Sequence, residues 1–155
     1  MSSTAVPTPS TGSTPVAGWR VTFDVIQKWV ALLGLLLSLL QVAFAALGFW
    51  GAEEKPGDQA WGMEAFGLHA TNGMILYTIA AVLFVLGLLA LSGWKAWVIP
   101  LVLFLLLFFV QGILVGLGFG VSRWYGFLHA LDGTLIIAGF AWLYFDRLRR
   151  PLKAR

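Results

Sequence analysis

The sequence predicts an all-α integral membrane protein, a four-transmembrane-helix bundle built from a duplicated helical hairpin. Three observations support this prediction. The chain of 155 residues is 59% hydrophobic and only 11% charged, whereas a soluble domain carries about 25% charged residues. Four long apolar runs follow one another, and the last two repeat a pattern found in the first two. The chain also has no cysteine, which excludes disulfides, thiolate metal sites, iron–sulfur clusters and covalently attached c-type haem.

The first 18 residues are predicted to form a disordered tail. They are mainly Ser, Thr, Pro and Gly and carry no charged side chain. Such a segment cannot bury enough apolar surface to offset the entropy lost on ordering. It lacks the basic region of a signal peptide, and the first apolar run is too long for one, so we expect no cleavage. The membrane domain is predicted to cover residues 19–146.

Each of the four apolar runs reaches the length of a transmembrane helix. The runs are 20 to 26 residues long, and a helix of about 20 residues crosses a hydrocarbon core of about 30 Å. The predicted spans are residues 29–50, 66–91, 96–119 and 126–145. An even number of spans places both ends of the chain on one side of the lipid bilayer.

The basic residues predict which side that is. Eight of the ten lie on the side of the chain ends: Arg20, Lys28, Lys95, Arg147, Arg149, Arg150, Lys153 and Arg155. Lys55 and Arg123 lie in the loops on the other side. Because positively charged segments stay in the cytoplasm, both termini are predicted to be cytoplasmic, in a bacterial-type plasma membrane. Residues 147–155 are interpreted as a basic cytoplasmic tail at anionic head groups. The charge pattern does not indicate nucleic acid.

An internal repeat is the most informative feature. Gln41 is followed by Leu-Gly-Phe at 47–49, and Gln111 by the same tripeptide at 117–119, an offset of 70. Leu-His-Ala-Thr-Asn-Gly at 68–73 matches Leu-His-Ala-Leu-Asp-Gly at 128–133, an offset of 60. Each unit holds two spans, so both copies cross the membrane in the same orientation, related by a pseudo-two-fold axis along the membrane normal.

The repeat contains the only two histidines of the chain, His69 and His129. In an up-down bundle the second and fourth spans are diagonal, with axes roughly 11–14 Å apart. That gap suits a planar cofactor held between two imidazoles, and a haem iron takes both as axial ligands. The alternatives are another metal, a pigment such as chlorophyll, or structural histidines bonded to each other or to loop carbonyls. Zinc fits less well, because two histidines fill half of a closed tetrahedral shell.

Other residues of the motif fit a macrocycle between the helices. Gly73 and Gly133 follow the histidines by four residues, on the same helix face, where a missing side chain lets a ring approach the backbone. Arg123 is the only basic residue of the second outer loop and is a candidate partner for a haem propionate. Lys55 is the candidate in the first outer loop.

Polar residues inside the spans have two interpretations each. Asn72 and Asp132 could orient an imidazole, or pair with Gln111 and Gln41 inside the bundle. Asp132 is a functional candidate because a carboxylate within a span is costly, although a hydrated structural role near the interface remains open. The glutamines are interpreted as hydrogen-bonding links between helices, with a quinone or haem contact as the alternative. The spacing Gly-x-x-x-Gly at 112–120 indicates close helix packing, within the bundle or with a partner.

From about Gln41 to Tyr144 the chain resembles one four-helix haem-binding half of the haem A synthase family and, more loosely, small bis-His membrane b-type cytochromes. It also resembles uncharacterised small four-span bacterial membrane proteins with the same histidine motif. The resemblance implies a haem b site with His69 and His129 as ligands. The family has two bundles and a catalytic carboxylate, whereas this chain has one histidine pair and no equivalent Glu in its first span. The resemblance therefore does not extend to haem A synthesis.

The sequence thus predicts a membrane b-type cytochrome with one haem near the outer face, working in electron transfer or quinone redox chemistry. One outer haem cannot carry electrons across the bilayer, so a larger membrane redox complex, or a homo-oligomer, is the expected partner. The alternative is a cofactor-free accessory subunit of a membrane complex, which has no enzyme activity of its own. A transporter is less well supported, because the spans lack the paired charges and broken midplane helices of a translocation site.

Overall fold

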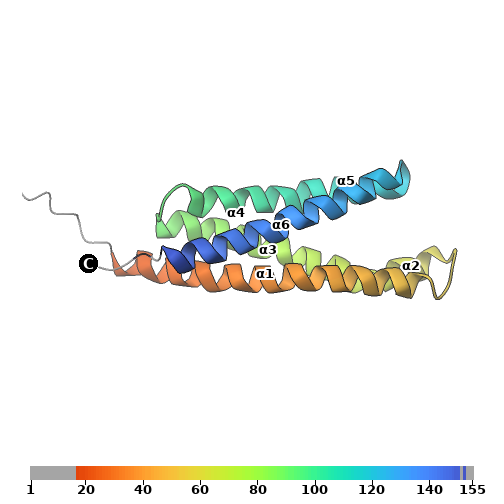
Figure 1. Cartoon of the computed structure of the whole chain (residues 1–155), viewed down its shortest axis with the longest axis horizontal. Coiled ribbons are helices and arrows are strands. Elements are labelled where there is room, and N and C mark those ends of the chain that lie inside the picture. Colours follow the sequence, from red (N-terminus) through yellow and green to blue (C-terminus); the bar gives the residue numbers. More distant parts are fainter. Residues whose placement is uncertain (1–16, 151, 153–155) are drawn as a thin grey trace, which may run out of the picture.

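The computed structural model describes residues 17–150 and 152. Its helices follow one another in this order: α1 (Gly18–Ala52), α2 (Gln59–Ala65), α3 (Gly67–Ala90), α4 (Lys95–Leu105), the π-helical turn η1 (Leu106–Val110), α5 (Gln111–Gly120) and α6 (Arg123–Arg149). Helices α4, η1 and α5 continue directly into one another as one rod (Figure 1). Most of the predicted tail, residues 1–16, lies outside the described residues, as do Lys153 and Arg155.

Within the described residues, four helices are long and apolar enough to cross a membrane: α1, α3, the α4–α5 rod and α6. For the part of the chain that the structure describes, this finding confirms the predicted all-helical fold with four candidate spans. Two helices extend beyond the predicted bounds. Helix α1 begins at Gly18 rather than at residue 29, and α6 continues to Arg149 rather than ending at 145. The added helical turns carry charged side chains, so a prediction based on apolar runs does not include these turns.

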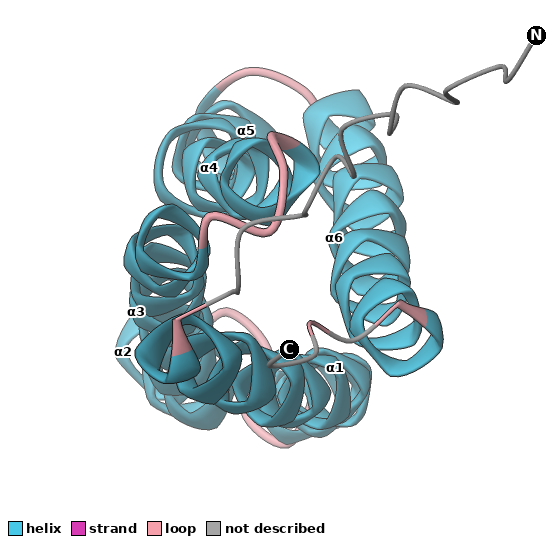
Figure 2. Ribbon diagram, turned by 90° about the vertical axis from the view of Figure 1, so that its left-hand side faces the viewer, coloured by secondary structure: helices cyan, strands magenta, loops and turns pink. Residues whose placement is uncertain are grey.

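The four long helices form a bundle in which α3 and α6 are diagonal. Helix α1 packs against α3 and α6, and the α4–α5 rod also packs between α3 and α6. Within the described residues, α3 and α6 do not pack on each other, in agreement with the predicted up-down order (Figure 2). The second and fourth spans therefore face each other across the middle of the bundle.

The bundle is packed more tightly at one end than at the other. We call the end with the turn at 91–94 and the last turn of α6 the termini end, and the end with residues 53–66 and the turn at 121–122 the histidine end. Helix α6 runs obliquely, from beside α1 at the termini end to beside α5 at the histidine end (Figure 1). In the described part of the chain, α5 packs on α6 and not on α1 or α3.

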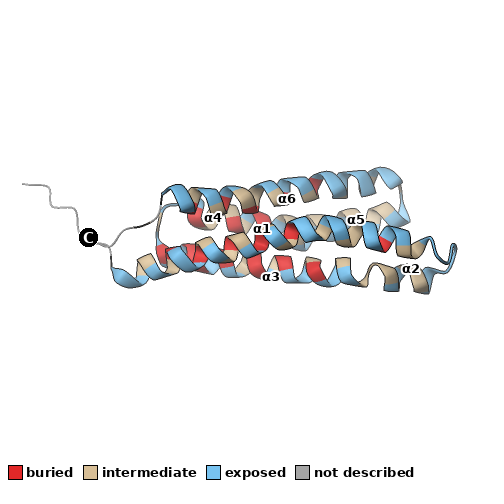
Figure 3. Ribbon diagram, turned by 60° about the horizontal axis from the view of Figure 1, so that its bottom comes forward, coloured by how far each residue is buried: buried red, intermediate tan, exposed pale blue. Residues whose placement is uncertain are grey.

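The apolar core lies on the facing sides of the helices (Figure 3). It consists of Ala31, Leu76, Ile79, Ala80, Leu83, Leu103, Ile136, Phe140 and Leu143. Gly34 is needed here because the Phe140 ring occupies the place where a Cβ would lie. The outward faces expose many large apolar side chains, such as Leu36 and Val85. Contiguous apolar surface of this kind is stable only against lipid or a partner.

The loop between the first two spans contains a helix that was not predicted. The Asp58 carboxylate caps α2 by accepting a 3.1 Å hydrogen bond from the Trp61 backbone N–H. The Trp61 indole donates to the Gly51 carbonyl over 2.7 Å, and the Lys55 ammonium lies 3.7 Å from the Trp61 ring. A capping Asp before a short mixed segment is a recognisable helix start, so the signal was present in the sequence.

Candidate functional site

The structure brings the two histidines together from diagonal helices. His69 lies in the first turn of α3, and His129 in the second turn of α6. Their ring centroids are 6.1 Å apart and the ring planes are inclined by 58°. Both residues are half-buried. In the described structure α3 and α6 do not pack on each other, so the two imidazoles approach each other from separated helices.

The imidazole of His69 is held from two sides. Its Nδ1 lies 3.2 Å from the backbone carbonyl oxygen of Gln41, so a proton on Nδ1 is donated to that oxygen. The other ring nitrogen, Nε2, then keeps its lone pair, which is the form that binds a metal. The Phe66 ring meets the imidazole edge-on, with centroids 6.1 Å apart. Phe66 itself packs closely over Gly48 of α1.

The glutamines link helices in both hairpins, as predicted. Gln41 Nε2 donates to the backbone carbonyl of His69 over 2.9 Å, and Gln111 Nε2 donates to the carbonyl of His129 over 3.0 Å. Each glutamine thereby fixes the turn that carries a histidine. Gln111 follows directly after η1, and a π-helical turn changes the direction of the side chains that follow it.

Asn72 and Asp132 are buried and pair with the glutamine of their own hairpin. Asn72 Nδ2 donates to Gln41 Oε1 over 2.6 Å and to the Leu37 carbonyl over 3.0 Å. Gln111 Nε2 donates to Asp132 Oδ2 over 2.7 Å. The sequence had suggested pairing across the bundle, Asn72 with Gln111 and Asp132 with Gln41. The structure differs because each residue sits one helical turn after its histidine, where the adjacent helix of the hairpin is nearest.

The two motif glycines border the histidines differently. A Cβ added to Gly73 would contact Gln41 Nε2 at 3.5 Å, whereas one added to Gly133 would meet nothing within 4 Å. His129 Nδ1 is buried and has no hydrogen-bond partner in the described structure. A side chain at position 133 would therefore meet open space, whereas Nδ1 of His129 is covered by neighbouring atoms.

The two outer basic candidates lie in different settings. Arg123 is the first residue of α6 and is exposed, six residues before His129. Its helix is capped by the Ser122 hydroxyl, which accepts from the Trp124 N–H over 3.4 Å. Lys55 is exposed and stacks on Trp61. Both remain at the histidine end, where a propionate partner was expected.

The histidine pair fits a single metal ion held by two imidazoles. An imidazole nitrogen binds a first-row metal at about 2.0 Å, and the ring centre lies about 1 Å behind it, so two imidazoles on opposite sides of one ion have centres about 6 Å apart. The observed separation of 6.1 Å matches. Among the described residues, no three His, Asp or Glu side chains gather as metal ligands. A closed tetrahedral zinc site needs four.

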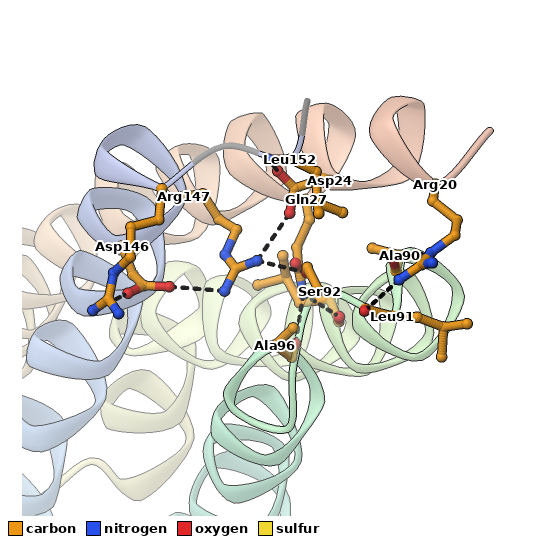
Figure 4. A network of polar contacts seen from close by, with 12 residues as sticks. Arg20, Asp24, Gln27, Ala90, Leu91, Ser92, Ala96, Asp146, Arg147 and Leu152 are labelled. Carbon is orange, nitrogen blue, oxygen red and sulfur yellow. Dashed lines mark hydrogen bonds and ion pairs between the residues drawn. The ribbon is translucent and has the colours of Figure 1, made fainter. Parts of the chain in front are cut away.

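A second polar cluster lies at the termini end and was missed by the sequence analysis. Arg147 was assigned to a basic tail at the lipid head groups, but the structure buries it within α6. Its Nη1 donates to Asp24 over 2.9 Å and to the Ser92 hydroxyl over 2.6 Å, and its Nη2 donates to Asp146 over 2.7 Å (Figure 4). Asp24 and Gln27, both buried, stand one turn apart on α1. That spacing of polar residues on one helix face was the available signal.

Comparison of the chain with protein-family models, curated proteins and solved structures found no match.

Proposed function

We propose that the chain is a membrane b-type cytochrome that binds one haem b through His69 and His129. One observation carries this proposal: the only two histidines of the chain come from opposite sides of the bundle and face each other with centroids 6.1 Å apart. The hydrogen bond at His69 Nδ1 supports it, because it leaves Nε2 free for a metal.

The chemistry that this group supplies is one-electron transfer at the iron. With both His69 and His129 holding the iron, the group would supply electron transfer rather than oxygen chemistry. The protein's own residues position the ligands. Gln41 and Gln111 fix the helical turns that carry them, and the absence of a side chain at Gly133 would let a flat ring approach the helix backbone. A lipid-soluble quinone is a suitable electron donor or acceptor, because the site lies among membrane helices.

We also propose that the bundle is a duplicated hairpin related by a pseudo-two-fold axis along the membrane normal. Equivalent residues make equivalent contacts, since each glutamine bonds the carbonyl of one histidine. The pairs Asn72 with Gln41 and Asp132 with Gln111 are equivalent as well. A duplicated hairpin explains why two ligands stand at the same depth.

In the membrane, we propose that both termini face the cytoplasm of a bacterial-type cell. The support is the distribution of basic residues, with Lys55 and Arg123 alone at the histidine end. The haem then lies near the outer face, and electrons are exchanged there with a larger redox complex or a second copy of the chain.

The test is a visible spectrum of the detergent-purified protein, reduced with dithionite minus oxidised, after expression with ample haem. Sharp α and Soret bands are expected in the wild type and are lost in both His69→Ala and His129→Ala. Thr71→Ala is the control, because Thr71 is exposed on the same helix two residues after His69, and it keeps the bands. A featureless wild-type spectrum would overturn the proposal.

The second candidate is a cofactor-free accessory subunit, favoured by one observation on α5. Gly112, Gly116 and Gly120 are exposed, and a Cβ added to any of them meets nothing within 4 Å. The small-residue spacing therefore faces away from the bundle, where a partner helix can approach closely. On this reading the purified protein is colourless, and His69→Ala folds like the wild type.

A further inference from the structure

Two tryptophans from different elements flank the ammonium group of Lys95 at the termini end. The Lys95 Nζ lies 5.6 Å from the centre of the Trp94 ring and 5.7 Å from the centre of the Trp142 ring. Trp94 belongs to the turn before α4, and Trp142 stands on α6. All three residues are exposed. Because an aromatic ring attracts a cation within about 6 Å of its centre, the ammonium is held where α4 and α6 meet. We call these three residues the Lys95 site.

The charge of Lys95 is not neutralised within the described part of the chain. The ion pairs found there join arginines to carboxylates, and none includes this lysine. Asp146, one turn after Trp142 on α6, is already bound by Arg147 at 2.7 Å and by Arg150 at 3.0 Å. An exposed ammonium without an acidic partner leaves the Lys95 site positively charged, so the chemistry that complements it is an anion.

Three further features of this end of the bundle favour an anion. Arg149 stands two turns after Trp142 on the same face of α6 and is exposed. Helix α4 begins at Lys95, and the positive end of a helix dipole attracts negative charge. Each of the two indoles carries an N–H donor on an otherwise apolar ring, and such rings favour the boundary between hydrocarbon and head groups.

Apolar surface continues from the Lys95 site along both helices. Val102 lies two turns after Lys95 on α4, and Leu135 lies two turns before Trp142 on α6. Both side chains are exposed, and both positions lie within the candidate membrane spans. An anion bound at Lys95 that also carries long hydrocarbon chains can therefore use both surfaces. A phospholipid has these two parts, whereas free phosphate has only the first.

We propose that the Lys95 site binds the head group of an anionic phospholipid in the leaflet at the termini end, with its acyl chains along α4 and α6. The ammonium supplies the charge, and the two indoles hold it at the depth of the head groups. A zwitterionic lipid carries its own cation, which opposes the attraction, so phosphatidylglycerol is preferred over phosphatidylcholine. This inference is independent of haem binding, and a protein without haem bands leaves it intact.

Native mass spectrometry of the full chain in a nonionic detergent counts bound lipids and gives their affinity. We expect the wild type to bind phosphatidylglycerol more tightly than phosphatidylcholine. Lys95→Gln is expected to weaken phosphatidylglycerol binding by about fivefold, the effect of one basic residue near an anionic surface, and Lys95→Arg is expected to retain it. Lys28→Gln is the matched control, because Lys28 lies over a single ring, that of its neighbour Trp29, at 4.7 Å. This variant loses the same charge and binds like the wild type.

Three outcomes would overturn the proposal. Equal affinity of the wild type for the two lipids removes the preference for an anion, and this comparison needs no variant to fold. Equal losses in Lys95→Gln and Lys28→Gln indicate a general attraction to the basic end of the bundle and remove the assignment to Lys95. Displacement of phosphatidylglycerol by inorganic phosphate would show that free phosphate is the ligand, whereas we expect no displacement. Equal melting temperatures of the variants in lipid-free detergent are expected and confirm that they share one fold.

Discussion

At the scale of single residues, the buried pair of Asp24 and Arg147 holds together segments distant in the sequence. Asp24 stands on α1 and Arg147 on α6, and both side chains are at most 5% exposed. Ser92 in the turn after α3 accepts a further bond from the same guanidinium. Taking two charges out of water is costly, and only close geometry with extra hydrogen bonds offsets that cost. The cluster therefore depends on all its members being present.

Removing one member is expected to be worse than removing both charges. Arg147→Leu leaves the Asp24 carboxylate buried without its cation and is expected to lower the free energy of unfolding by about 3–5 kcal/mol. The double variant Asp24→Leu/Arg147→Leu is expected to lose less than this single variant. The measurement is reversible unfolding in mixed micelles. Arg149→Leu is the control, because Arg149 is exposed, and it changes little. Equal losses in the single and double variants would contradict this account.

The difference between Asn72 and Asp132 is a difference of charge at equivalent positions. In the proposed cytochrome, a negative charge on Asp132 would stabilise the oxidised, more positive iron over the reduced one. Asp132→Asn is expected to raise the haem reduction potential by on the order of 50 mV, a modest Coulomb effect. Asn72→Asp is expected to lower it. A redox titration of the Soret band measures both, and two shifts of the same sign would refute the electrostatic explanation.

At the scale of elements, the contact of α3 with α4 depends on a proline and a glycine. Pro100 has no backbone N–H, so the Ala96 carbonyl, four residues earlier, lacks its normal helical donor. Gln27 Nε2 donates to this carbonyl over 2.6 Å and to the Leu83 carbonyl over 3.1 Å. Gly87 lies directly opposite, where a Cβ would collide with the Ala96 carbonyl. A buried amide thus replaces the hydrogen bond that the proline removes.

Gly87→Ala is expected to force α3 and α4 apart and to destabilise the bundle by about 1–3 kcal/mol or more, because backbone atoms cannot move aside as a side chain can. Gly112→Ala on α5 is the matched control. It adds the same methyl group in open space and is expected to be neutral or stabilising, since alanine favours a helix. Thermal unfolding in detergent compares the two, and similar melting temperatures would argue against the close approach.

An element can be predicted from the sequence when the interactions that form it lie within the element itself. The four spans were predictable because each is a continuous apolar run, and their diagonal order followed from the short connections. The start of α1 was not predictable, because Asp24 and Gln27 are held in this helix by hydrogen bonds to residues of other elements. The turn η1 has no signal in its apolar residues. The meeting of His69 with His129 followed from the repeat, but the unequal Nδ1 contacts depend on backbone positions that the motif does not specify.

At the scale of the whole molecule, the two ends of the bundle differ in how their helices are joined. The termini end joins α1, α3, α4 and α6 through Arg147 and Gln27, and the apolar core continues from it. At the histidine end, in the described residues, α5 packs on α6 but not on α1 or α3. The contacts that join all four long helices are therefore concentrated in the half away from the histidines.

The direction of this bundle in the membrane can be tested because the chain has no cysteine of its own. Glu54→Cys places a thiol at the exposed histidine end, and Arg149→Cys places one at the exposed termini end. Since basic residues concentrate at the termini end, it is expected to stay in the cytoplasm. A membrane-impermeant maleimide should label the Glu54→Cys variant in intact cells, and the Arg149→Cys variant only after the membrane is opened. The reverse pattern would place the histidines on the cytoplasmic side, and equal labelling of both in intact cells would show a mixed orientation.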